Sequence, residues 1–137
     1  MMLQKRRREL MTMNIEQPQP ITLNVPVNRA GYGVNNNSIY AISGMYCSDY
    51  IEIPNGAVSI VSMKWQSEIE HRYRVGYTET YGQTEDIINL NGSATGGNPA
   101  VTCTESEIYT IPVSARYIVI SAVVSAPIDV QVTLYNN

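Results

Sequence analysis

The stretch Glu107–Val124, EIYTIPVSARYIVISAVV, predicts a short strand, a corner and then the most apolar strand of the chain. Pro112 has a fixed φ and no backbone N–H, so it can close a strand but cannot lie inside a central one. Ala115 is small enough to sit beneath a corner. After it, Tyr117–Val124 is rich in the β-branched and aromatic residues that favour strands. The stretch therefore indicates a β fold with a sharp turn at the proline.

The same arrangement occurs earlier in the chain, at Ile53–Ile60. Both Ile53–Ile60 and Ile111–Ile118 read I-P-x-x-A-x-x-I. The repeat predicts two similar corners in one fold.

The rest of the chain from Ile21 onward also has a β pattern. Ile21, Leu23 and Val25 alternate with polar residues, as expected for a half-buried strand. The Gly- and Asn-rich residues 30–38 and the long stretch 91–106 are predicted to be loops. The expected strands cover 21–25, 38–43, 49–53, 57–65, 71–80, 86–90, 108–111, 117–124 and 128–135. This spacing predicts an all-β, antiparallel two-sheet sandwich, with a jelly roll as its topology.

Length and composition indicate one domain with a tyrosine-rich surface. The chain has 137 residues, enough for a single core. It has ten tyrosines, one tryptophan and no phenylalanine, and tyrosine suits half-exposed β surfaces and interfaces better than a deep core.

The first twenty residues differ from the rest and predict a short basic helix followed by a proline linker. Residues 2–13 are good helix formers, whereas Pro18 and Pro20 favour an extended backbone. A helix this short needs a partner surface to persist in water, so residues 1–20 are either an assembly anchor or a solvated terminus. The β-sandwich domain is expected over 21–137. The residues expected to form the anchor are Leu3, Arg6, Arg7, Arg8, Leu10 and Met11.

Charge and hydropathy exclude several classes of partner. Residues 1–13 carry a charge of +3, and the remaining chain carries five basic against eleven acidic residues, a charge of −6. Such an acidic body argues against nucleic-acid binding. No apolar stretch is long enough for a transmembrane helix, and no signal peptide is recognised, so the protein is expected to be kept in a cytoplasm or assembled there, without associating with membranes. Cys47 and Cys103 are interpreted as buried thiols rather than as a disulfide, because such a compartment is reducing.

No catalytic or metal-binding pattern is present, so the chain is expected to be neither an enzyme nor a cofactor-binding protein. His71 is the only histidine, and it follows Glu68 and Glu70 in a charged segment that is typical of a solvated strand edge. Glu85 and Asp86 are equally unsuited to a glycosidase, which needs two carboxyls across a cleft. One histidine and two distant cysteines do not supply the four ligands of zinc.

Four aromatic residues that lie close in sequence are candidates for glycan binding, because aromatic faces stack on sugar rings. The competing interpretation is that these rings fill the core in place of phenylalanine. It is favoured because Tyr73, Val75 and Tyr77 alternate on one apolar face. The four residues are Trp65, Tyr73, Tyr77 and Tyr81.

Several short patterns carry a resemblance to known β modules. They are Ser48–Pro54, Gly56–Ala57, Val75–Tyr77, Tyr81–Gly82 and Ile111–Ile118. Together they resemble the jelly-roll modules of tailed-bacteriophage appendages, and similar carbohydrate-binding β-sandwiches, over residues 38–135. In those modules an S-x-Y-I-x-V-P strand opens into a G-A turn, and a V-P-x-x-A-x-Y-I-R corner follows later. Here the second corner begins with Ile111, and Val119 stands in place of the final arginine.

The resemblance implies a structural virion protein, such as a fibre, tail or capsid-decoration component. It implies a homotrimer that assembles in the host cytoplasm and attaches to other virion proteins, for which residues 1–20 are the expected anchor. The alternative is a carbohydrate-binding module that recognises bacterial surface glycans.

Overall fold

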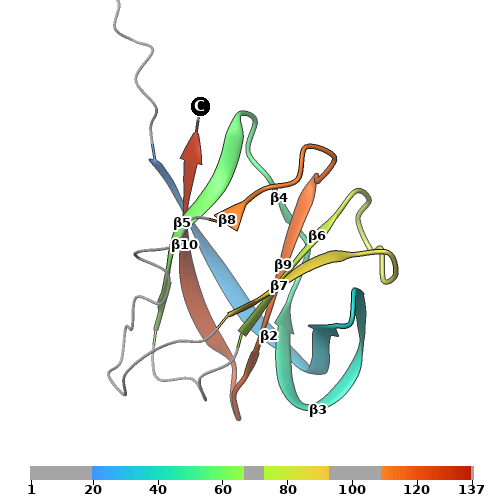
Figure 1. The fold of residues 1–137 in the computed structure, drawn as a ribbon. Coiled ribbons are helices and arrows are strands. Elements are labelled where there is room, and N and C mark those ends of the chain that lie inside the picture. The colour runs from blue at the N-terminus through green and yellow to red at the C-terminus, as the bar shows by residue number, and fades with distance from the viewer. Residues whose placement is uncertain (1–19, 67–72, 93–108, 137) are drawn as a thin grey trace, which may run out of the picture.

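The computed structural model describes residues 20–66, 73–92 and 109–136, and the regular structure in these ranges is entirely β (Figure 1). The predicted helix at 2–13 and its anchor residues lie outside the described residues, as do Glu68, Glu70, His71 and Cys103. Within the described ranges, no helix has the length and apolar character needed to span a bilayer.

The strands follow the predicted order. They are β2 (Pro20–Asn35), β3 (Ser38–Ser48), β4 (Ile51–Glu52), β5 (Ala57–Trp65), β6 (Tyr73–Thr78), β7 (Ile88–Gly92), β8 (Tyr109–Thr110), β9 (Tyr117–Val123) and β10 (Ile128–Asn136).

All of these strands belong to one antiparallel sheet of nine strands that curls on itself (Figure 1). The order is β7-β6-β9-β3-β2-β10-β5-β8, and β4 pairs with β9 beside β3. β2 pairs with β10 along Pro20–Val27 and with β3 along Val27–Asn35, so this one long strand joins the two halves of the curled sheet.

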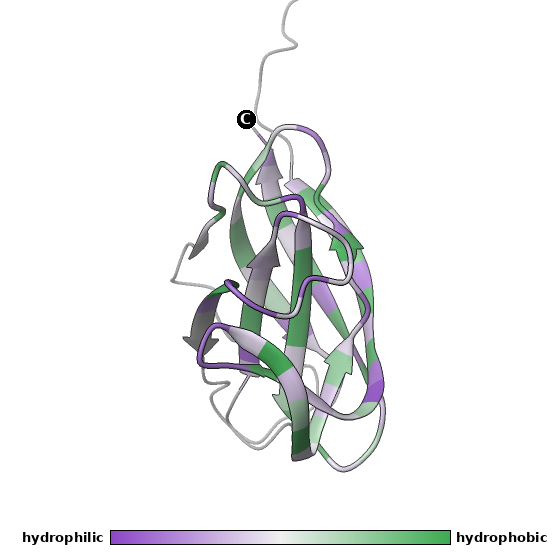
Figure 2. Ribbon diagram, turned by 90° about the vertical axis from the view of Figure 1, so that its right-hand side faces the viewer, coloured by the Kyte–Doolittle hydropathy of each residue, from purple (hydrophilic) through white to green (hydrophobic). Residues whose placement is uncertain are grey.

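The main core lies inside the curl, between β5 and β10 on one side and β6 and β9 on the other. In β10, Val130, Val132 and Leu134 are buried, as the alternation predicted, whereas Gln131 and Tyr135 are exposed. Figure 2 shows the same alternation as hydrophobic bands along the strands. Each fully buried side chain of this size contributes about 2 kcal/mol through the hydrophobic effect.

β9 is buried on both of its faces. Ile118 and Ile120 point into the main core, whereas Val119 belongs to a second cluster on the opposite face. The β2–β3 hairpin contributes to this second cluster, where the Val34 N–H donates to the Ser121 Oγ over 3.0 Å. Burial on both faces explains why β9 is a continuous apolar run rather than an alternating one.

The prediction of a loop at residues 30–38 was wrong, because most of this segment is a β-hairpin. β2 continues to Asn35, and Asn36 and Asn37 form its two-residue turn with φ values of 51° and 63°. Positive φ at both central positions is the geometry that such hairpins require, and asparagine tolerates it. Gly31, with φ 78°, lies where the register of β2 against β3 shifts, so it marks a bulge inside the strand rather than its end.

The other differences lie at strand ends. β3 extends five residues beyond the expected Ser43, to Ser48. The expected strands at 49–53 and 86–90 correspond to β4 and β7, at Ile51–Glu52 and Ile88–Gly92.

Both predicted proline corners are confirmed as turns. The Ala57 N–H donates to the Pro54 carbonyl over 3.2 Å, and the Ala115 N–H donates to the Pro112 carbonyl over 3.0 Å. The shared I-P-x-x-A pattern therefore encodes the same local hydrogen bond twice.

Candidate functional site

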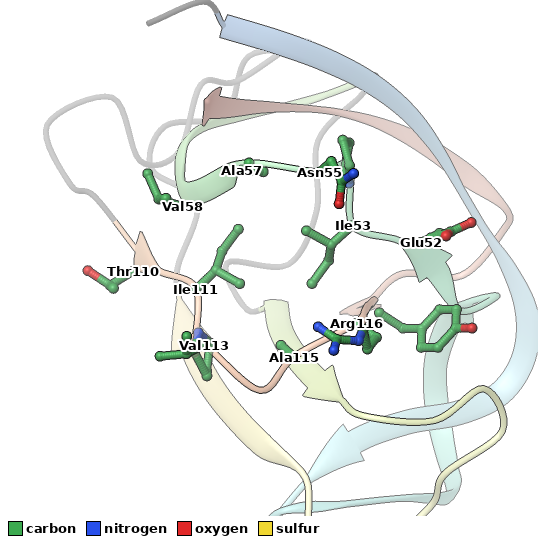
Figure 3. A pocket seen from close by; sticks show the side chains of 14 residues that line it. Glu52, Ile53, Asn55, Ala57, Val58, Thr110, Ile111, Val113, Ala115 and Arg116 are labelled. Carbon is green, nitrogen blue, oxygen red and sulfur yellow. The ribbon is translucent and has the colours of Figure 1, made fainter. Parts of the chain in front are cut away.

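The two proline corners lie side by side and line a single groove of about 690 Å³ (Figure 3). Its lining comprises Glu52–Val58, Thr110–Val113 and Ala115–Tyr117. We call this feature the corner groove. Its volume lies in the range of about 300–1,000 Å³ that is typical of small-molecule sites.

Backbone hydrogen bonds between strand ends fix the walls of the corner groove. The Ile53 N–H donates to the Arg116 carbonyl, and the Ile111 N–H donates to the Val58 carbonyl, each over 2.9 Å. The Arg116 N–H donates to the Thr78 carbonyl over 2.8 Å. These backbone hydrogen bonds therefore anchor to the sheet the two turns that line the groove.

The lining combines apolar and polar side chains. Ile53 and Ala115 are half-buried and pack against the main core, so they give the groove an apolar floor. Glu52, Asn55 and Arg116 are exposed and supply the polar groups. Figure 3 shows the Arg116 guanidinium group directed towards the middle of the groove, whereas the Glu52 carboxylate lies at its edge and points outward.

A row of three tyrosines continues from the wall of the groove across the surface. The rings of Tyr117 and Tyr81 meet edge to face with their centroids 5.7 Å apart, and the rings of Tyr81 and Tyr50 lie 5.1 Å apart at 42°. Both arrangements are favourable for aromatic pairs. Tyr81 is the most open of the three, with 61% of its surface exposed. We call these residues the tyrosine row.

Hydrogen bonds fix the orientation of the row. The Tyr81 hydroxyl and the Tyr50 N–H both donate to Asp49 Oδ1, each over 2.7 Å, and the Tyr50 hydroxyl donates to the Gln83 carbonyl over 2.6 Å. The hydrogen bond that the Tyr81 hydroxyl donates to Asp49 raises the pKa of Tyr81 above its ordinary value, because it favours the protonated hydroxyl. Burial likewise raises the pKa of Tyr50.

The Gln83 side chain ties together the loop that carries Tyr81. Its Oε1 accepts from the N–H groups of Glu79 and Thr80 over 2.9 and 3.2 Å. Its Nε2 donates to the carbonyls of Glu85 and Asp86 over 2.8 and 3.2 Å. The loop therefore presents the Tyr81 ring in a fixed position.

Of the four predicted glycan-binding aromatics, only Tyr81 lies on the surface. Trp65, Tyr73 and Tyr77 are 0%, 1% and 2% exposed and belong to the main core. The core interpretation is confirmed for these three residues, and their rings are closed to a stacking ligand.

Sequence reasoning missed the partners of Tyr81. Tyr50 and Tyr117 lie within the patterns that indicate the fold, the S-x-Y-I strand and the second corner, and nothing in these patterns places them beside Tyr81. Their approach to Tyr81 depends on the pairing of β4 and β6 with β9, which the sequence alone does not specify.

The remaining titratable groups form no catalytic constellation within the described ranges. No group of three His, Cys, Asp or Glu side chains there is arranged to hold a metal ion. Cys47 is buried, and the loss of solvation raises the pKa of its thiol to about 11, which makes it a poor nucleophile.

No protein-family model, curated protein or solved structure matches this chain.

Proposed function

We propose that this chain is a structural virion protein of a tailed phage, an oligomeric head or tail appendage attached through its N-terminal residues. The observation that supports this best is the pairing of Pro20 with Tyr135 at one end of β2 and β10 (Figure 1). The polypeptide that precedes Pro20 therefore joins the body at one end, on a strand that runs through both halves of the sheet. This is a suitable attachment for a terminal tether.

For the fold, we propose a jelly-roll sandwich whose two sheets are the halves of the curled sheet. One half is β8-β5-β10-β2 and the other is β2-β3-β9-β6-β7, so β2 belongs to both. The enclosure of the main core between the two halves supports this division.

The proposed role is structural rather than enzymatic. The corner groove contains one carboxylate among its lining residues, that of Glu52, and hydrolysis of a glycosidic bond generally needs two.

Deletion of residues 1–13 tests the proposed tether. We expect the shortened chain to keep the circular-dichroism spectrum of its β body but to be lost from purified virions. Replacement of Arg6, Arg7 and Arg8 by lysine is the matched control, because it keeps the positive charge and should preserve incorporation. Normal incorporation of the deleted chain would contradict the tether.

Light scattering on the purified full chain tests the proposed homotrimer. A mass three times that of the 15.2 kDa chain is expected. A monomer that also fails to associate with virion components would overturn the assignment.

A carbohydrate-binding module is the second candidate function, and the tyrosine row is the observation that favours it. Tyr81 offers an exposed ring whose orientation is fixed before any ligand arrives. A glycan array incubated with the full chain tests this function directly: binding to no glycan at high protein concentration would exclude it.

A further inference from the structure

We infer that the corner groove and the adjoining tyrosine row form one binding site for a neutral oligosaccharide. This inference rests on the second candidate function and gives it a location and a ligand class. Tyr117 belongs both to the wall of the groove and to the row, so the two features form a continuous surface.

The polar groups of the groove indicate a ligand rich in hydroxyl groups. Arg116 donates hydrogen bonds, Glu52 accepts them, and the Asn55 amide does both. Glu52 and Arg116 are both exposed, so a ligand can reach their charged groups. An apolar ligand would leave these groups without partners, whereas sugar hydroxyls donate to the carboxylate and accept from the guanidinium.

The apolar floor of the groove and the tyrosine row suit the apolar C–H face of a sugar ring. A pyranose has an apolar C–H face and a polar edge, which matches an apolar floor of Ile53 and Ala115 below polar side chains. Tyr81 extends this surface with a ring already held by Asp49 and by the Gln83 loop. Little conformational entropy is then lost when a ligand stacks on it.

The charge of the site favours a neutral ligand over an anionic one. Among the residues that line the groove, Glu52 and Arg116 are the only charged ones, so the lining has no net formal charge. Asp49 accepts directly from the Tyr81 hydroxyl, and the backbone groups of three more acidic residues, Glu79, Glu85 and Asp86, bond the Gln83 side chain. One basic residue, Arg29, lies near Tyr50, so the formal charge around the row is negative. A carboxylated sugar would meet this negative potential, which is strongest at low salt.

Saturation-transfer NMR and calorimetry on the full chain test the inference with defined probes. The neutral probes are maltotriose, mannotriose and tri-N-acetylchitotriose, and the anionic probe is tri-galacturonic acid. We expect at least one neutral trisaccharide to bind with a Kd in the millimolar range or tighter, and the anionic probe to bind more weakly at low salt.

Two substitutions test the location of the site. Arg116→Ala removes charged hydrogen-bond donors and should weaken binding about tenfold. Tyr81→Ala removes the stacking ring and should weaken it about fivefold. Lys64→Ala and Tyr135→Ala are the matched controls, because each removes an exposed residue of similar kind elsewhere on the body, and both should bind like the wild type.

Three outcomes would overturn the inference: no binding of any neutral probe at millimolar concentration, tighter binding of the anionic probe, or equal affinity in Arg116→Ala and wild type at unchanged Tm. These outcomes are independent of the tether, since virion incorporation is measured separately with the deletion of residues 1–13.

Discussion

Cys47 shows how one buried residue makes the stability of the body depend on pH. Its side chain is fully buried in the second cluster, and loss of solvation raises the pKa of its thiol from 9.0 to about 11. The nearby Arg29 lowers this pKa, but the effect of burial is larger. The thiol therefore stays protonated in the folded protein at neutral pH.

Alkylation of Cys47 should require unfolding. We expect iodoacetamide at pH 8 to leave Cys47 unmodified in the native protein and to modify it fully in guanidinium chloride, because the thiolate is the reactive form. Peptide mass mapping measures modification at this position. Rapid modification in the native state would show that the second cluster is open.

Stability should fall as the pH rises from 9 towards 11. The thiol ionises near pH 9 in the unfolded chain but near pH 11 in the folded protein. Its contribution to the free energy of unfolding is therefore complete below pH 9 and is lost as the pH rises from 9 to 11. Cys47→Ala should reduce the slope of stability against pH, measured by urea unfolding at several pH values. The raised pKa values of Tyr50 and Tyr81 act in the same direction at somewhat higher pH, so a residual slope should remain in the variant.

At the scale of the strand, β9 depends on polar contacts as well as on apolar burial. Ser121 is fully buried, and its hydroxyl accepts from the Val34 N–H of the β2–β3 hairpin. Ser48, which is also fully buried, makes a similar contact, because its Oγ accepts from the Ile120 N–H over 2.9 Å. The hydroxyls of these two serines therefore accept hydrogen bonds from backbone N–H groups that the pairing of strands does not satisfy.

Ser121→Ala should therefore destabilise the protein by about 1–3 kcal/mol, because it leaves the Val34 N–H buried without this acceptor. Urea unfolding measures the loss. Ser125→Ala is the control, since Ser125 is exposed just after β9, and it should change stability little. If Ser121→Ala left the free energy of unfolding unchanged, the β2–β3 hairpin would have to shift so that the Val34 N–H finds another acceptor.

Gly76 in β6 tests how closely the second cluster is packed. A Cβ at this position would lie 3.1 Å from Ile87 Cγ2 and 3.3 Å from both methyl carbons of Val34. We expect Gly76→Ala to cost about 1–3 kcal/mol through overpacking, measured by urea unfolding. If the contact between the new Cβ and the Val34 methyl groups causes the loss of stability, adding Val34→Ala should recover part of it. No recovery in the double variant would contradict overpacking against Val34.

At the scale of the whole molecule, the sequence predicted the strands better than their arrangement. The corners at Pro54 and Pro112 and the inward residues of β10 follow from local pattern and were confirmed. The β2–β3 hairpin was missed because its glycines and asparagines serve a bulge and a tight turn, which have the same composition as a loop.

The candidate site could be predicted only in part. Tyr81 was singled out, but its neighbours Tyr50 and Tyr117 are 31 and 36 residues away in the sequence. Both I-P-x-x-A corners were recognised individually. Their meeting in one groove depends on the pairing of β4 with β9 and of β5 with β8, which are contacts between distant segments.

The position of Pro20 has a mechanical consequence. Tension applied through the residues that precede it would enter β2 along the strand axis. Eight residues of β2 pair with β10, and the following residues pair with β3. Such a load would pull on many ladder hydrogen bonds in shear at the same time, rather than peeling them apart one by one. Force along the tether would therefore unfold the body only when β2 slides against β10 and against β3 at the same time.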